Sequence, residues 1–265
     1  TGPYAVSQPV TRTEDPRLLT GRGNYTDDKN LPGQAHAAFL RSPVGHAVVK
    51  GIDTGAAESA PGVLLVLTHK DIAEAGFGTL PNNLPLKSRD GTPLIKPPRP
   101  VLATDKVRHL GQPVAHDEAP GNVCLDFQMG DADKAAEGFA RAAHVTKLRL
   151  VNNRCFVSPM EPRAAIGDYD TDADRWVLHV CSQGVMGMRN VLANAVLNCE
   201  PEKLLVLTSD VGGSFGMKSL PYNEYPVVLL AAKTLGRPVK WTADRSEACV
   251  SDHQGRAAVY EAELA

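Results

Sequence analysis

The chain has 265 residues, of which 43% are hydrophobic and 22% charged, a composition typical of a soluble globular protein with one large or two small domains. Its 28 basic and 30 acidic side chains are mixed along the sequence and leave a net charge of -2, so we expect no nucleic-acid partner. The apolar runs are far shorter than the ~20 residues that cross a bilayer, and the first residues do not resemble a secretory signal, so we expect no membrane partner.

The five cysteines lie far apart, form no CxxC pair and are odd in number. This pattern argues against a zinc site, an iron–sulfur cluster and a disulfide framework. Isolated cysteines are typical of small buried residues in a reducing compartment, so we expect a cytoplasmic protein. The eight histidines show neither an HExxH motif nor a pair at helical spacing, and we expect no metal ion bound directly by the protein.

The first half of the chain predicts mixed α and β structure. Strands are expected over 34–40 and 46–53, and 63–68 is a short β-rich apolar run bounded by Pro61-Gly62. A helix is expected over 69–75. The proline-rich stretch 76–113 offers few backbone donors for a regular ladder, which favours an extended loop.

In the second half, an alanine-rich stretch predicts a helix over 131–144, followed by a strand over 144–151. A domain boundary is expected near 115–130. Beyond it, the pattern predicts a strand hairpin and then alternating helices and strands: strands 164–169 and 176–181, helix 185–197, strand 204–208, loop 210–219, helix 223–235 closed by Gly236, and strand 239–242. The charged residues 245–247 predict a surface helix or turn.

The segment VGGSFGMKS over 211–219 lies in the loop between the predicted strand 204–208 and the predicted helix 223–235. It is the segment that indicates a chemical function. Its glycines allow tight turns and expose backbone N–H groups, which suits an anion or oxo group. Met217 stands where a phosphate-binding P-loop needs glycine, and the glycine spacing does not match GxGxxG. A glycine-rich turn required only for packing is the alternative.

This loop resembles the GGGFGGK loop of the molybdenum-binding large subunit of xanthine dehydrogenase and aldehyde oxidase-type hydroxylases. The resemblance implies that the backbone beside Phe215 contacts an oxo ligand of molybdenum. The segment CSQG over 181–184 resembles the family segment whose glutamine hydrogen-bonds a molybdenum oxygen, which implies that role for Gln183. The cofactor-binding residues implied in this way are Gln183, Gly212, Gly213, Ser214, Phe215 and Gly216.

Other stretches extend the resemblance over nearly the whole chain. Residues 12–28 and 40–43 are similar to the opening of the family's hammerhead domain, and 158–163 and 235–241 to signatures of its cofactor-binding region. The resemblance implies an α+β fold, with a shortened α/β-hammerhead domain over 1–120 and the first part of the molybdopterin-binding domain over 121–265. Within the family, the chain resembles the aerobic carbon monoxide dehydrogenase-like branch.

The resemblance also implies a function and partners. Family members hold molybdopterin, in its plain or cytosine dinucleotide form, and hydroxylate an aldehyde, an N-heterocycle or a small CO-like substrate with oxygen from water. FAD and [2Fe-2S] would sit on partner chains, a flavin-binding medium subunit and an iron–sulfur small subunit, so a hetero-oligomer is expected.

Four departures from the family limit this expectation. Residues 112–115 run directly into 116–120, where the family has further strands and a helix. The general-base glutamate of the family is not in the sequence, so we expect no catalytic residue in this chain and little activity from it alone. Ser214 and Met217 replace glycines, so Ser214 must hold a negative φ or be strained. Ser219 replaces the substrate-binding glutamate of purine-oxidising members, which disfavours a purine.

Several alternatives remain open at this stage. Gln183 taken alone could be a surface or capping side chain, and Glu161 could form a structural ion pair with Arg163 or another base. Lys218 could bind a carboxylate, contact a pterin phosphate or be solvated. For the whole chain, a non-catalytic remnant of the same fold is the main rival to an enzyme, and a nucleotide-phosphate binder is the second.

Overall fold

The computed structural model describes residues 11–81, 84–107 and 123–265. Its mixture of helices and strands confirms the predicted α+β class. Among the helices in the described ranges, none is long and apolar enough to pass through a membrane. The predicted boundary at 120/121 and the junction of 112–115 with 116–120 lie outside the described residues.

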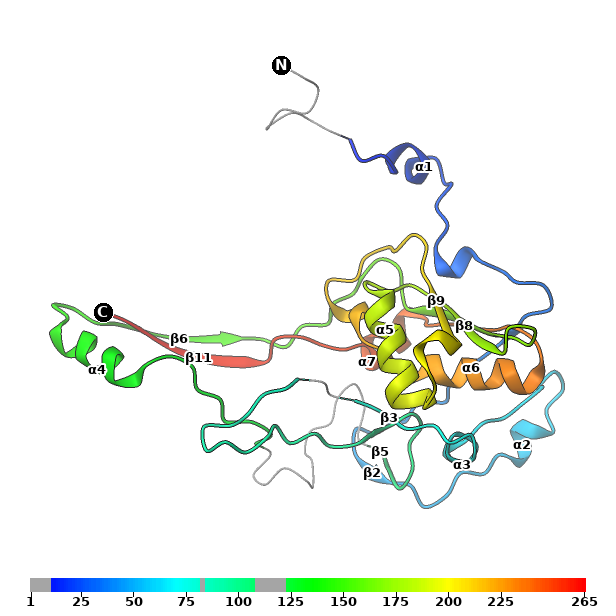
Figure 1. Cartoon of the computed structure of the whole chain (residues 1–265), viewed down its shortest axis with the longest axis horizontal. Coiled ribbons are helices and arrows are strands. Elements are labelled where there is room, and N and C mark those ends of the chain that lie inside the picture. The colour runs from blue at the N-terminus through cyan, green and yellow to red at the C-terminus, as the bar shows by residue number, and fades with distance from the viewer. Residues whose placement is uncertain (1–10, 82–83, 108–122) are drawn as a thin grey trace.

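A five-stranded sheet with the order β1-β10-β7-β8-β9 lies in the compact part of the molecule, on the right in Figure 1, and contributes much of the core. The strands are β1 (Ala35–His36), β7 (Ala164–Asp170), β8 (Arg175–Val180), β9 (Leu204–Leu207) and β10 (Val239–Thr242). β7 pairs antiparallel with both β8 and β10, whereas β8–β9 and β1–β10 are parallel pairs. The predicted hairpin and the two later strands are therefore confirmed, and a strand from the first half of the chain joins their sheet.

Two helices cover the central sheet. α5 (Val185–Val191) continues into a π-helical stretch, Leu192–Leu197, and together they match the helix predicted over 185–197. α6 (Glu224–Leu235) packs on β7, and Gly236 closes it with a left-handed φ of 63°, as predicted. Close contact between α6 and β7 requires Gly167, because a Cβ there would lie 2.4 Å from the Val228 carbonyl oxygen. α7 (Arg245–Ser251) follows β10 and accounts for the charged turn or helix expected at 245–247.

Besides β1, the elements described in the N-terminal half are also short. These are α1 (Asp15–Leu19), the 3-10 helix Thr26–Asp28, α2 (Gly55–Glu58), α3 (His69–Glu74) and the pairs β2–β5 (Ala47–Val48, Lys106–Val107) and β3–β4 (Thr79–Leu80, Arg99–Pro100). The helix predicted over 69–75 is confirmed, but the strands predicted over 34–40 and 46–53 each have a regular ladder over only two residues. The β-rich run 63–68 forms no ladder; Leu65 and Leu67 pack against the core instead.

A separate arm extends away from the sheet and includes the C-terminal residues (Figure 1). It consists of α4 (Ala132–Arg141) and the antiparallel pair β6 (Thr146–Asn152) and β11 (Ala258–Leu264). α4 and β6 agree with the predicted helix and strand, and the Asp131 side chain caps α4 by accepting a hydrogen bond from the Lys134 N–H at 3.0 Å. The sequence reasoning did not predict β11.

Candidate functional site

The loop predicted to carry chemistry connects β9 to α6 and ends in a 3-10 turn, Met217–Ser219. Gly213 and Gly216 have φ values of 103° and 94°, which side chains rarely tolerate, so glycine is required at both positions. Ser214 does not have a positive φ. Of the two alternatives expected from the sequence, a negative φ or a strained backbone, the structure therefore agrees with the first. The left-handed conformation falls on the next residue, Phe215, with φ 52°.

Phe215 lies at the outer surface of this loop, with 80% of its area exposed. A Cβ on Gly213 would come within 3.2 Å of both the Phe215 ring and the buried Pro159 side chain. The loop therefore packs closely against the segment 158–163, and the absence of a side chain at Gly213 lets the ring fold over the backbone. A large exposed aromatic residue on a strained backbone is uncommon and marks a candidate binding surface.

Gln183 lies between β8 and α5 and is joined to this loop by both its backbone and its side chain. Its N–H donates to the Lys218 carbonyl at 3.2 Å. Its side-chain oxygen, Oε1, accepts hydrogen bonds from the Gly216 N–H at 3.1 Å, the Ser214 hydroxyl at 2.6 Å and the Ser219 hydroxyl at 3.1 Å. The structure therefore brings together Gln183, Ser214 and Gly216, and it adds Ser219, which the sequence reasoning did not include among the site residues.

The base of the loop is fixed by a buried ion pair between Lys218 and Glu161. The Lys218 ammonium lies 2.9 Å from Glu161 Oε2, and the two side chains are 0% and 9% exposed. Glu161 Oε2 also accepts the Gly212 N–H at 2.8 Å, and the Glu161 N–H donates to the Gly212 carbonyl at 3.0 Å. Of the roles left open for these residues, Glu161 pairs with Lys218 rather than Arg163, and Lys218 holds a carboxylate. Gly212 is necessary here because a Cβ would lie 2.6 Å from Glu161 Cβ.

The remaining donors of the loop have no partner within the described part of the chain. Hydrogen bonds account for the N–H groups of Gly212, Gly216, Met217, Lys218 and Ser219. The backbone N–H groups of the three consecutive residues 213–215 form no hydrogen bond with the described residues, and neither does Nε2 of Gln183. The exposed face formed by Gln183 and the loop thus offers N–H donors in excess, which suits a ligand that carries hydrogen-bond acceptors.

Arg163 lies in the segment 158–163, which resembles a signature of the family's cofactor-binding region. Its side chain belongs to the core and not to the face formed by Gln183 and the loop. Its guanidinium is 0% exposed, lies 2.7 Å from Glu224 Oε2 and 2.5 Å from Asp252 Oδ1, and stacks 3.7 Å from the Tyr222 ring centroid. Burial raises the pKa of Glu224, but the charges of Arg163 and Arg41 outweigh it and lower that pKa to about 2. This network joins α6 to α7, so these ionised groups stabilise the fold beneath the loop.

The N-terminal segment reaches the same loop at its first residue. Asp210 accepts hydrogen bonds from the Arg17 guanidinium, 2.7 Å between Nη2 and Oδ1, and from the Asn24 N–H at 2.7 Å. The hydrogen bond from Arg17 is the largest influence that lowers the pKa of Asp210 to about 2. Residues of the predicted hammerhead opening therefore support the loop directly, a contact that the sequence did not indicate.

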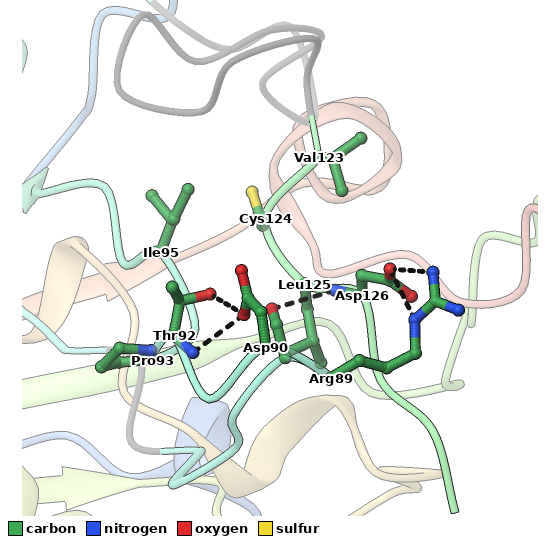
Figure 2. Close-up of a pocket in the computed structure, with 10 residues that line it drawn as sticks. Arg89, Asp90, Thr92, Pro93, Ile95, Val123, Cys124, Leu125 and Asp126 are labelled. Carbon is green, nitrogen blue, oxygen red and sulfur yellow. Dashed lines mark hydrogen bonds and ion pairs between the residues drawn. The ribbon is translucent and has the colours of Figure 1, made fainter.

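The described parts of the chain contain no cluster of side chains suited to a metal ion. No group of three or more His, Cys, Asp or Glu side chains there could hold a metal ion. A surface pocket lies between the turn at 88–95 and residues 123–126 (Figure 2). Its polar groups are engaged with each other, since Arg89 pairs with Asp126 and the Thr92 hydroxyl donates to Asp90 at 2.6 Å. None of the predicted site residues lines it, so the loop face is the stronger candidate.

Comparisons with known proteins identify relatives along nearly the whole chain. A family model described as the molybdopterin cofactor-binding domain matches residues 115–265, and one described as the aldehyde oxidase and xanthine dehydrogenase a/b hammerhead domain matches residues 20–116. The nicotine 6-hydroxylase large subunit of Paenarthrobacter nicotinovorans is 35% identical over 278 residues, which cover 91% of this chain and 34% of that protein. Subunit gamma of the 6-hydroxypseudooxynicotine dehydrogenase complex from the same organism is 33% identical, with 98% of this chain and 37% of that subunit covered.

A solved structure has the same fold. The crystal structure of the Cu,Mo-CO dehydrogenase in its carbon monoxide reduced state superposes with a TM-score of 0.80 and 25% identity, and covers 98% of this chain and 38% of that one. The chain therefore spans little more than a third of the length of the relatives it matches. The alignment to the dehydrogenase complex subunit runs over 313 residues, more than the 265 of this chain, so that relative has residues inside the aligned range that this chain lacks.

Proposed function

This chain belongs to the aldehyde oxidase and xanthine dehydrogenase family and corresponds to the N-terminal portion of its molybdenum-binding large subunit, and from that premise we propose that Gln183 and the Phe215 loop form part of a molybdenum-cofactor site. The supporting observation is the shared contact between Gln183 and the loop, with unpaired N–H donors beside it. The proposed cofactor-binding residues are Gln183, Gly212, Gly213, Ser214, Phe215 and Gly216. When bound, the cofactor would supply the redox chemistry that adds an oxygen atom from water to the substrate.

The residues present fit such a group in their chemistry. Nε2 of Gln183 and the N–H groups of residues 213–215 can donate to acceptor atoms of the cofactor, and none of the described carboxylates accepts from these donors. The Phe215 ring would exclude water from one side of the bound group. We assign no general base to the described residues, since Glu161 and Glu224 are both held in buried ion pairs.

For the substrate, we propose an aldehyde, an N-heterocycle or a small CO-like molecule. An N-heterocycle is supported by the name of the nicotine 6-hydroxylase relative, and carbon monoxide by the CO dehydrogenase structure. Ser219, in place of the glutamate of purine-oxidising members, disfavours a purine. We propose that iron–sulfur and flavin subunits complete a hetero-oligomer, as the complex subunit among the relatives suggests.

The test is the cofactor content of the chain purified from a host that makes molybdopterin. Molybdenum is measured by mass spectrometry and the pterin by fluorescence after oxidation. We expect both in the wild-type chain, and about tenfold less in Gln183→Leu, because loss of an outer hydrogen bond typically lowers affinity 10–100-fold. Gln128→Leu is the matched control, since Gln128 is exposed and lies outside the loop face.

Two outcomes would favour the rivals. A wild-type chain with a folded circular dichroism spectrum but neither molybdenum nor pterin would support a non-catalytic remnant of the same fold. A rise in melting temperature with ATP or NAD, abolished by a substitution at Gly213, would support a nucleotide-phosphate binder. Identical cofactor content in Gln183→Leu and Gln128→Leu would refute the role proposed for Gln183.

A further inference from the structure

The amide of Gln183 is held in one orientation by donors from the loop. The Gly216 backbone N–H can only donate, so the Gln183 atom that faces it at 3.1 Å must be the oxygen. The nitrogen, on the other side of the amide carbon, is therefore directed away from Gly216. An isolated exposed glutamine could place either atom outward, whereas this one presents Nε2.

Two serine hydroxyls reinforce that orientation, and their hydrogen bonds can be counted. Ser214 Oγ accepts the Lys218 N–H at 3.1 Å, and its single hydrogen is directed to Gln183 Oε1 at 2.6 Å. The hydrogen of Ser219 has two acceptors, the Gly216 carbonyl at 2.9 Å and Gln183 Oε1 at 3.1 Å, so it serves Gln183 only part of the time. Ser214 should thus contribute more than Ser219.

We propose that Ser214 and Ser219 are positioning residues that hold the Gln183 amide with Nε2 outward and thereby make it an obligate hydrogen-bond donor. The group bound at this point must then present an acceptor, such as a deprotonated oxygen, and a group that presents only a donor is excluded. The identity of the bound group rests on the proposed function, but the orientation of the amide does not.

The experiment follows the side-chain amide of Gln183 by nuclear magnetic resonance in the uniformly ¹⁵N-labelled 265-residue chain. The variant Gln183→Glu, which removes the NH₂ group, identifies the signal. Hydrogen bonds to a carbonyl oxygen strengthen the partial double bond to nitrogen, so they slow rotation of the NH₂ group. In Ser214→Ala we expect the rotation to be faster, by at most the factor of about five that one hydrogen bond of ordinary strength represents. Ser219→Ala should show a smaller change.

Three controls separate positioning from a general loss of structure. Ser214→Thr keeps the hydroxyl and should restore the slow rotation, while Ser42→Ala removes a hydroxyl that donates to the Val44 carbonyl and to no residue of the loop, and should change nothing at Gln183. Backbone amide signals of β7 and β8 report whether the fold is intact. A double variant Ser214→Ala/Ser219→Ala with a folded spectrum and an unchanged Gln183 rotation rate would overturn the proposal. Because no cofactor is needed, this result is independent of the molybdenum measurement.

Discussion

Two antiparallel strand pairs in this chain have ladders of similar length and very different surroundings. β7 and β8 lie in the central sheet, and their Ala165, Leu178 and Val180 side chains are fully buried in the core on the face that α6 covers. β6 and β11 pair in register over seven residues, yet Leu148, Leu150 and Val151 are 54%, 48% and 59% exposed. The hydrogen-bond ladder is common to both pairs, so the difference in burial comes from the helix that packs on one of them. Net stability follows burial more than backbone pairing, and the site loop follows β9, the strand that pairs with β8 in the buried sheet.

The largest expected difference between these regions comes from their ion pairs. In Lys218→Met the buried Glu161 carboxylate loses its partner, and we expect the free energy of unfolding to fall by about 3–5 kcal/mol. Lys147→Met removes the partner of Glu263 in the arm, where the two side chains are 72% and 44% exposed, and should cost about 0–1 kcal/mol. Urea unfolding followed by tryptophan fluorescence measures both, since Trp176 and Trp241 lie in the central sheet. Equal losses would mean that the Lys218–Glu161 pair is not desolvated as described.

Alanine substitutions at two glycines should change stability in opposite directions in the two regions. Gly167→Ala places a Cβ 2.4 Å from the Val228 carbonyl oxygen and 2.7 Å from the Leu229 nitrogen, so α6 must move, and we expect a loss of about 1–3 kcal/mol. Gly138→Ala lies in α4 with nothing within 4 Å of the new Cβ and should increase helix stability by about 0.5–1 kcal/mol. The urea midpoint reports the first and the helical circular dichroism signal the second. A stabilised Gly167→Ala would contradict the close packing of α6 on β7.

Much of the central fold could be predicted from the sequence because its signals are local. Two strand-forming segments joined by the acidic turn 170–174 predict the hairpin, and the apolar run of α6 ends at Gly236, whose left-handed φ matches a helix cap. Short elements whose partners lie far away in sequence were not predictable in this way. β11 pairs with β6 across more than a hundred residues, and 63–68 remains without a partner strand although its composition favours one.

For the site, the sequence indicated which residues are involved but not how they are connected. The resemblance placed Gln183 and the loop 212–216 in one set, and the structure brings the Gln183 side chain into contact with Ser214 and Gly216. The Ser219 contact and the attachment of Asp210 to Arg17 depend on the positions of elements distant in the chain, for which no local pattern exists. The role of Glu161 was left open because a single carboxylate next to Arg163 gives no indication that a lysine 57 residues away is its partner.

A smaller, pH-dependent effect is expected at the edge of the central region. The hydrogen bond from Arg17 holds the pKa of Asp210 at about 2, below its usual 3.8. A carboxylate with a lowered folded-state pKa stabilises the fold above its usual pKa and loses that contribution as the pH falls toward the folded value. We expect α1 to detach from the loop as the pH falls from about 4 to about 2. The ¹³C carboxyl shift of Asp210 and the amide signals of α1 measure this transition. In Asp210→Asn the α1 signals should show no such transition; a midpoint near 4 in the wild-type chain would contradict the Arg17 contact.

The smallest expected effect on global stability is in the arm. Leu150 is 48% exposed and faces Tyr260, also 48% exposed, across the β6–β11 ladder. A two-stranded ribbon is marginally stable in water without a packed face, so Leu150→Ala should change the free energy of unfolding of the central region by less than about 0.5 kcal/mol. The variant should instead accelerate amide hydrogen exchange in β6 and β11 and leave β7 and β8 unchanged, because the arm can open without disturbing the sheet. If exchange in β7 and β8 rose together with that in β6, the two strand pairs would form one cooperative unit, and the site loop would depend on the arm for its stability.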